Sequence, residues 1–169
     1  MTVRAANVED AAGIAAVHVE SWRWSYKGLL PQKELDALDV EARTRSWRTQ
    51  LAAVGSEPRR TLVATDEVGI CVFAAVGPCR DHDARGEGEL YAIYLALRAA
   101  GRGIGHALLE EAHAALRTLG FREVTLWVLR NNARAIAFYV REGYAPDGES
   151  KVEDDRCGGE PQLRYRRAL

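Results

Sequence analysis

Hydrophobic and polar positions follow two different periods along the chain. Between residues 7 and 24, apolar side chains recur at helical spacing, as at Ile14, Val17 and Trp22. Asn7 stands just before this stretch and is a suitable helix cap. Between residues 61 and 76, the apolar positions are instead nearly continuous and rich in β-branched residues, which is typical of buried strands. The chain is therefore expected to mix helices and strands.

Extended along the chain, the same patterns predict an α/β fold. Helices are expected over residues 7–24, 39–53, 103–119 and from Asn131 or Asn132 to about residue 143, with a short helical turn at Pro31. Strands are expected over residues 3–5, 61–65, 68–76, 89–97, 121–129 and 163–167, and residues 77–88 are expected to form an exposed loop. A hairpin followed by βαβ crossovers predicts a single twisted, mixed β-sheet with helices on both faces, formed by residues 1–169 as one domain.

Composition narrows the class of protein. The hydrophobic content of 47% and the formal net charge of −1 are ordinary for a soluble protein and predict no attraction to nucleic acid or to anionic lipid. The chain has no signal-peptide pattern and no run of the ~18 apolar residues that a membrane span needs. Cys71, Cys79 and Cys157 lack metal-ligand spacing, so no metal site is predicted. We expect a cytoplasmic protein.

The most informative segment is residues 93–109, which read I-Y-L-A-L-R-A-A-G-R-G-I-G-H-A-L-L. An apolar strand leads into a turn in which glycine alternates with other residues, and the turn opens directly into a helical pattern. Glycine permits backbone conformations that other residues avoid. The unpaired N–H groups of a first helical turn, together with the helix dipole, favour a negative charge in front of them. The segment therefore predicts an anion site, most simply for phosphate.

Three phosphate-binding motifs compete for this turn. A P-loop requires Lys followed by Ser or Thr after the last glycine, but His106 and Ala107 follow Gly105 here. A dinucleotide fingerprint requires G-x-G-x-x-G, and its last position is also occupied by His106. The remaining motif, R/Q-x-x-G-x-G/A at a helix start, is the pyrophosphate loop of the GNAT N-acetyltransferases. Without a ligand, the same glycines would simply allow close packing at a helix start.

Two further segments favour the third motif. Residues 89–94, E-L-Y-A-I-Y, resemble the GNAT strand that lies beside the pantetheine arm. Residues 132–144 resemble the closing motif N-x-x-A-x-x-F-Y-x-x-x-G-F/Y of that family. The chain is thus similar to GNAT N-acetyltransferases over almost its whole length. One position departs from the pattern, because the arginine or glutamine of the loop motif falls on Ala100, and Arg98 or Arg102 would have to compensate.

The resemblance implies that acetyl-coenzyme A is the acetyl donor and assigns residues to it. Backbone N–H groups of the turn would hold the pyrophosphate, and the strand backbone before the turn would pair with the pantetheine amides. Asn132 would cap the last helix and reach the cofactor. The residues so assigned are Ile93, Tyr94, Leu95, Gly101, Arg102, Gly103, Ile104, Gly105, His106 and Asn132.

Catalytic roles also follow from the resemblance. Tyr139 would be the general acid that protonates the leaving thiolate, and Glu89 would be the general base that deprotonates the amine, often through water. His82, in the loop before Glu89, is the reserve base. Each residue also has an ordinary interpretation. Tyr139 could be an aromatic at the edge of the core, and Glu89 could be a solvated charge at a strand end.

The acceptor is the least determined part of the prediction. Trp22 and Tyr26 are expected to lie at the acceptor site, and the acidic segments 81–83 and 153–155 hint at a cationic amine. We expect acetyl transfer to a primary amine of a small molecule by direct attack in a ternary complex. The alternatives are a protein or peptide acceptor, a longer acyl group, and a coenzyme A-binding regulatory module without turnover. Proteins of this kind are often homodimers, which the sequence does not decide.

Overall fold

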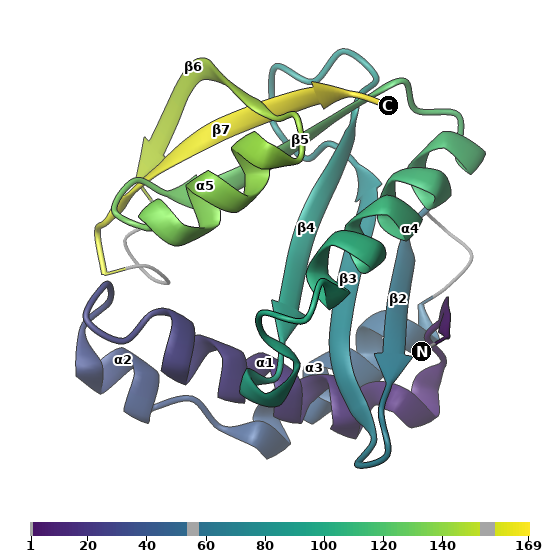
Figure 1. Ribbon diagram of the computed structural model, residues 1–169, viewed down its shortest axis with the longest axis vertical. Helices are drawn as coiled ribbons and strands as arrows, with labels where there is room; N and C mark the ends of the chain where they lie inside the picture. The colour runs from purple at the N-terminus through teal and green to yellow at the C-terminus, as the bar shows by residue number, and fades with distance from the viewer. Residues whose placement is uncertain (1, 54–57, 153–157) are drawn as a thin grey trace.

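A computed structural model describes residues 2–53, 58–152 and 158–169. The strands form one mixed seven-stranded sheet in the order β1-β2-β3-β4-β5-β7-β6 (Figure 1). Their bounds are β1 Val3–Ala5, β2 Arg60–Thr65, β3 Ile70–Pro78, β4 Gly88–Leu95, β5 Glu123–Leu129, β6 Ala145–Val152 and β7 Pro161–Ala168. The predicted twisted, mixed sheet of the α/β class is confirmed. That residues 1–169 form one domain stays a prediction.

The helices begin close to the caps that the sequence predicts. Asn7 caps a short 3-10 turn, Val8–Asp10, that leads into α1, while the Asp39 and Asn132 side chains accept backbone hydrogen bonds at the starts of α3 and α5. The helices are α1 Ala11–Ser25, α2 Gln32–Asp36, α3 Val40–Ala52, α4 Ile104–Thr118 and α5 Ala133–Arg141. A second 3-10 turn, Leu97–Ala99, separates β4 from α4. No helix among the described residues is long and apolar enough to cross a membrane.

Strand β3 is buried on both faces and shows how the layers are arranged. Val72, Ala74 and Val76 belong to the core cluster that includes the buried residues of α4, while Phe73 and Ala75 belong to the cluster that includes those of α1 and α3. Successive side chains of a strand point to opposite faces. Helix α4 therefore covers one face of the sheet and α1 with α3 the other, and α5 packs on the α4 side (Figure 1).

The sheet opens between β4 and β5. These parallel strands pair only at Gly88↔Val124 and Glu89↔Thr125 and then diverge, so the rest of β4 has no strand partner on that side (Figure 1). On its other side β4 remains paired with β3, with a register shift at Tyr91. A wedge-shaped opening in the sheet leaves backbone N–H and C=O groups of β4 facing it, and such groups need partners.

The structure differs from the sequence prediction in two details, one additional strand and one shorter loop. Strand β6 was not predicted, because its sequence A-P-D-G-E-S-K-V has no apolar alternation. It forms an edge strand with mostly exposed side chains, and its pairing with β7 shifts between Pro146 and Ser150, so little burial constrains its sequence. The predicted loop over residues 77–88 is shorter, since β3 extends through Pro78 and β4 begins at Gly88.

Candidate active site

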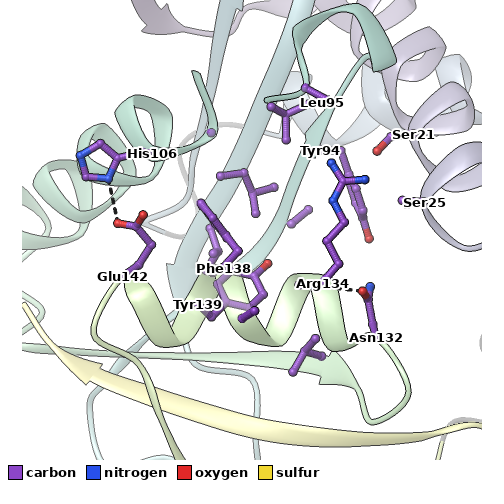
Figure 2. Close-up of a pocket in the computed structure, with 18 of the residues that line it drawn as sticks. Ser21, Ser25, Tyr94, Leu95, His106, Asn132, Arg134, Phe138, Tyr139 and Glu142 are labelled. Atoms are coloured by element: carbon purple, nitrogen blue, oxygen red, sulfur yellow. Dashed lines mark hydrogen bonds and ion pairs between the residues drawn. The ribbon is translucent and has the colours of Figure 1, made fainter. Parts of the chain in front are cut away.

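A cavity of about 540 Å³, called here the first cavity, occupies the opening between β4 and β5. It is lined by β4, by the glycine turn, by α5 and by the end of α1 (Figure 2). Most residues that the sequence assigns to the donor line it, namely Ile93, Tyr94, Leu95, Gly101, Gly103, Gly105, His106 and Asn132. Two residues of the same turn, Arg102 and Ile104, are not among its lining residues, and Ile104 packs against the core.

The glycine turn presents backbone N–H groups at the start of α4. Gly101 and Gly103 have φ values of 75° and 74°, a left-handed conformation that side chains with a Cβ rarely adopt. Gly103 is the N-cap of α4 and supplies no capping side chain, so the first N–H groups of this 15-residue helix have no side-chain acceptor. The turn therefore combines unpaired donors with the positive end of a helix dipole.

Cationic side chains near the turn differ in their availability. Arg98 donates to Asp66 through Nε at 2.8 Å and to the Ile70 carbonyl at 3.0 Å, so its guanidinium is already engaged. Arg102 is exposed and forms no ion pair with the described residues. Of the two arginines expected to compensate for Ala100, only Arg102 thus remains available for an anion at this turn.

The open edge of β4 is partly occupied by α1. Trp24 donates its Nε1–H to the Leu95 carbonyl at 3.3 Å, and the Arg134 guanidinium lies 4.7 Å from the centre of the Trp24 ring. Both side chains line the first cavity, and Figure 2 shows Arg134 extending into it from the start of α5. The contact between these two side chains could not be predicted from the sequence, because only the folded chain brings α1 and α5 together.

Tyr139 reaches the first cavity from α5 and lies among aromatic rings. Its ring centre is 5.3 Å from that of Phe138 and 5.7 Å from that of Tyr144. Burial, reinforced by the nearby Tyr94, raises the pKa of Tyr139 well above its ordinary value. The phenol is therefore protonated at neutral pH, as a proton donor must be.

At the C-terminal end of α5, the Glu142 carboxylate contacts His106 of α4. His106 Nδ1 lies 2.8 Å from Glu142 Oε2, as the dashed line in Figure 2 shows. This contact ties the first turn of α4 to the C-terminus of α5 across the first cavity, since both residues line it. The His106 side chain is thus held by a carboxylate, which leaves its backbone N–H as the group available to a ligand.

A second cavity, of about 710 Å³, lies on the side of the sheet that α1 and α3 cover. Trp22, Glu89 and residues of α3 line it. It shares six lining residues with the first cavity, and these include Tyr26 and Tyr94. The Tyr26 and Tyr94 hydroxyls are 3.3 Å apart. The two cavities therefore meet at this pair of tyrosines, which is the geometry that two reactants approaching from opposite sides require.

Comparison with known proteins gives the family. The model of the acetyltransferase (GNAT) family matches residues 17–144, which is most of the chain. The chain belongs to the GNAT acetyltransferase family.

Several members of the family are similar to this GNAT protein in sequence. The uncharacterized N-acetyltransferase YuaI of Bacillus subtilis is 36% identical over 87% of this chain and 80% of its own length. The spermidine N(1)-acetyltransferase of Thermoplasma acidophilum is 26% identical over 90% and 89%. A mycothiol acetyltransferase of Propionibacterium freudenreichii is 31% identical over 69% of this chain, which covers only 40% of that protein.

Solved structures agree on the fold. The PaiA N-acetyltransferase of Thermoplasma acidophilum, solved in complex with coenzyme A, aligns over the full length of both chains with a TM-score of 0.76 and 22% identity. This likeness confirms the GNAT fold.

Glu89 differs in its surroundings from a solvated strand-end charge. Its side chain is 2% exposed and accepts three hydrogen bonds from Arg80, from the backbone N at 2.9 Å, from Nε at 3.1 Å and from Nη2 at 2.6 Å. Glu89 nevertheless lines the second cavity, beside the junction with the first. Its role as a base stays a prediction, and the proton of the amine would be taken up by a carboxylate that already accepts hydrogen bonds from Arg80.

The other predictions for the acceptor side concern His82 and the acidic segments 81–83 and 153–155. His82 is exposed and lines neither cavity. Asp81 and Asp83 bind Arg164, whose side chain is 4% exposed, at 3.1 and 2.7 Å, and this arginine lowers the pKa of Asp83 to about 2. These two carboxylates are thus paired with an internal arginine, and the cationic acceptor suggested by segment 81–83 stays a prediction. Segment 153–155 lies outside the described residues.

Proposed function

We propose that this GNAT protein transfers the acetyl group of acetyl-coenzyme A to a primary amine of a small molecule by direct attack in a ternary complex. The observation that carries the proposal is the meeting of the two cavities at Tyr26 and Tyr94. One cavity joins the uncapped glycine turn, the open edge of β4 and the Tyr139 phenol. The other has the volume to hold a small acceptor.

The residues of the first cavity fit the coenzyme. Backbone N–H groups at the start of α4, with the helix dipole behind them, suit a pyrophosphate. The unpaired backbone of β4 suits the amides of a pantetheine arm, which would add to the sheet edge as a strand does. Arg102 supplies the positive charge that Ala100 does not.

Acetyl transfer requires the chain to hold the donor, to deprotonate the amine, to stabilise the tetrahedral oxyanion and to protonate the departing thiolate. The amine nitrogen forms a bond to the thioester carbon, and the C–S bond breaks as the tetrahedral intermediate collapses. Backbone N–H groups of β4 stabilise the developing oxyanion, because their dipoles are held in place by the pairing of β4 with β3. Tyr139 donates its phenolic proton to the departing thiolate. Burial keeps that phenol protonated until the thiolate forms.

The amine must also lose a proton, and Glu89 is the proposed base. Because its carboxylate accepts hydrogen bonds from Arg80 and lines the second cavity, a water molecule would carry the proton between the amine and Glu89. His82 remains the reserve base, and it would have to reach the second cavity from its exposed loop. A homodimer and a cytoplasmic location are further proposals that rest on the family.

The test is a thiol-release assay with acetyl-coenzyme A and a panel of polyamines, amino acids, aminoglycosides and peptide N-termini. Thiol release with one class of small amine, with the acetylated product seen by mass spectrometry, supports the proposal. Release with peptides alone would make the chain a protein acetyltransferase. Coenzyme A binding without release from any acceptor would make it a regulatory module. Competition with succinyl-coenzyme A identifies the acyl group.

A further inference from the structure

The second cavity is lined by several carboxylates, but these are already paired with positive charges. Three carboxylates line it, and each has a partner. Glu89 is paired with Arg80, and Asp81 accepts hydrogen bonds from the Trp127 indole and from Arg164. Glu34 lies at the outer edge, 4.0 Å from Lys33. None of these three carboxylates is left without a counter-charge for a cationic ligand.

Arg43 also lines the second cavity, but, unlike these carboxylates, its side chain has no counter-charge among the described residues. It is half-buried on α3, and its guanidinium forms no hydrogen bond or ion pair with the described residues. Its position is fixed by its own helix, because Trp47, one turn further along α3, is buried and donates its Nε1–H to His18 at 3.2 Å. A half-buried guanidinium without a partner is costly, and an anion in the cavity would remove that cost.

Two neutral donors stand on α1 opposite Arg43. Because the Trp47 indole can only donate, His18 Nδ1 is the acceptor, and the neutral ring carries its proton on Nε2. The His18 ring is 5.7 Å from that of Trp22, one turn along α1. The Trp22 Nε1–H is fully buried and has no hydrogen-bond partner among the described residues. A buried donor without an acceptor calls for one, and both residues line the second cavity.

We propose that the second cavity recognises an anionic group, such as a carboxylate, on the acceptor amine, with Arg43 as its counter-charge and the Trp22 and His18 N–H groups as additional donors. This inference rests on the proposed acetyl transfer and specifies its acceptor as an amino-acid-like molecule, in place of a polyamine.

The experiment compares amines that differ only in their charge. Each of several amino acids, including β-alanine and γ-aminobutyrate, is tested against its own carboxamide, and spermidine is included. With the wild-type protein, kcat/KM for the best carboxylate is expected to exceed that of its carboxamide by about tenfold or more, as a charge-assisted hydrogen bond gives. Equal values for the two members of each pair, or a preference for spermidine, would overturn the proposal.

Variants of Arg43 test whether this residue causes the preference for carboxylates. Arg43→Gln should lower kcat/KM for the carboxylates by about tenfold or more and leave the carboxamides and the KM for acetyl-coenzyme A unchanged, whereas Arg43→Lys should keep part of the preference. Arg48→Gln is the matched control, because Arg48 is exposed on the same helix and does not line the cavity. An equal loss for carboxylates and carboxamides in Arg43→Gln would contradict a role in anion binding.

A binding measurement separates this inference from the proposed reaction. With coenzyme A present, an N-acetyl amino acid should raise the melting temperature of the wild-type protein more than its carboxamide does, and Arg43→Gln should abolish the difference. If this holds but no acceptor releases thiol, acetyl transfer fails and the anion site stands. If thiol is released without any preference for carboxylates, the reaction stands and the anion site fails.

Discussion

The two cavities are formed by different kinds of chemical group, backbone in the first and side chains in the second. The first uses mainly backbone groups, which are the uncapped start of α4 and the open edge of β4, supplied by neighbouring stretches of sequence. The second uses side chains such as His18, Arg43 and Lys151, which come from three separate elements. A backbone site is defined by glycines and spacing, and it suits a donor common to a family. A side-chain site can change by single substitutions, and it suits an acceptor that differs between members.

The largest effect is expected from Tyr139, which lies where donor and acceptor would meet. Tyr139→Phe should lower kcat by about 100-fold with little effect on the Kd for coenzyme A, because only the acid is removed. The variant keeps the ring contacts with Phe138 and Tyr144. Steady-state kinetics and calorimetry measure the two quantities. An unchanged kcat would remove Tyr139 from the mechanism.

A second prediction addresses the backbone character of the first cavity. Gly103→Ala forces a side chain into a left-handed conformation at a cost of about 1–2 kcal/mol, so the turn should shift and the KM for acetyl-coenzyme A should rise by about tenfold. Gly120→Ala is the control. It introduces the same kind of strain beyond the other end of α4, at φ 94°. It should lower the melting temperature and leave the KM unchanged, and a similar rise in both variants would count against a backbone anion site.

A smaller effect is expected from the one charged side chain assigned to the donor. Arg102→Gln should raise the KM for acetyl-coenzyme A by about threefold to fivefold, because an exposed ion pair contributes on the order of 1 kcal/mol or less. Arg98→Gln should leave this KM unchanged, since Arg98 is bound to Asp66. The rise should disappear at high salt. A larger effect of Arg98→Gln would show that the two arginines have been assigned the wrong way round.

The last prediction concerns stability and not catalysis, namely the pH dependence of unfolding on the acceptor side. Burial, aided by the charge of Arg43, lowers the pKa of His18 to about 3. Between this value and the ordinary pKa of about 6.5, the unfolded chain takes up a proton that the folded chain does not, so stability falls as the pH is lowered through this range. The contribution is at most about 1.4 kcal/mol per pH unit. Urea unfolding at pH 4.5–6.5 should give a shallower slope for His18→Gln, and parallel slopes would contradict a neutral His18.

The sequence could predict what depends on local chemistry. Helix starts at Asn7, Asp39 and Asn132 follow from their capping side chains, and the anion turn follows from glycines at 101 and 103. The placement of the donor residues in one cavity agrees with the spacing of these motifs. The catalytic roles of Tyr139 and Glu89 came from the family resemblance and remain predictions.

The features that could not be predicted from the sequence depend on contacts between segments that are far apart in the chain. Strand β6 has no apolar alternation because it lies at the sheet edge. Asp81 and Asp83 resembled a solvated acidic loop, yet they neutralise Arg164, which lies about 80 positions further along the chain. Helical spacing places Arg43 on the stripe of α3 that carries the buried Trp47 and Leu51, but that spacing does not show that its guanidinium lines a cavity. Ion pairs and cavities of this kind are decided only when the elements pack.

The short joint between β4 and β5 has a thermodynamic consequence. Two pairs of residues connect the half of the sheet formed by β1 to β4 with the half formed by β5, β7 and β6. A coenzyme lying in the opening would therefore extend the continuity of the sheet as well as occupy a site. Because binding to the folded state raises its stability by mass action, the resistance of the whole chain to unfolding becomes linked to the concentration of its acetyl donor.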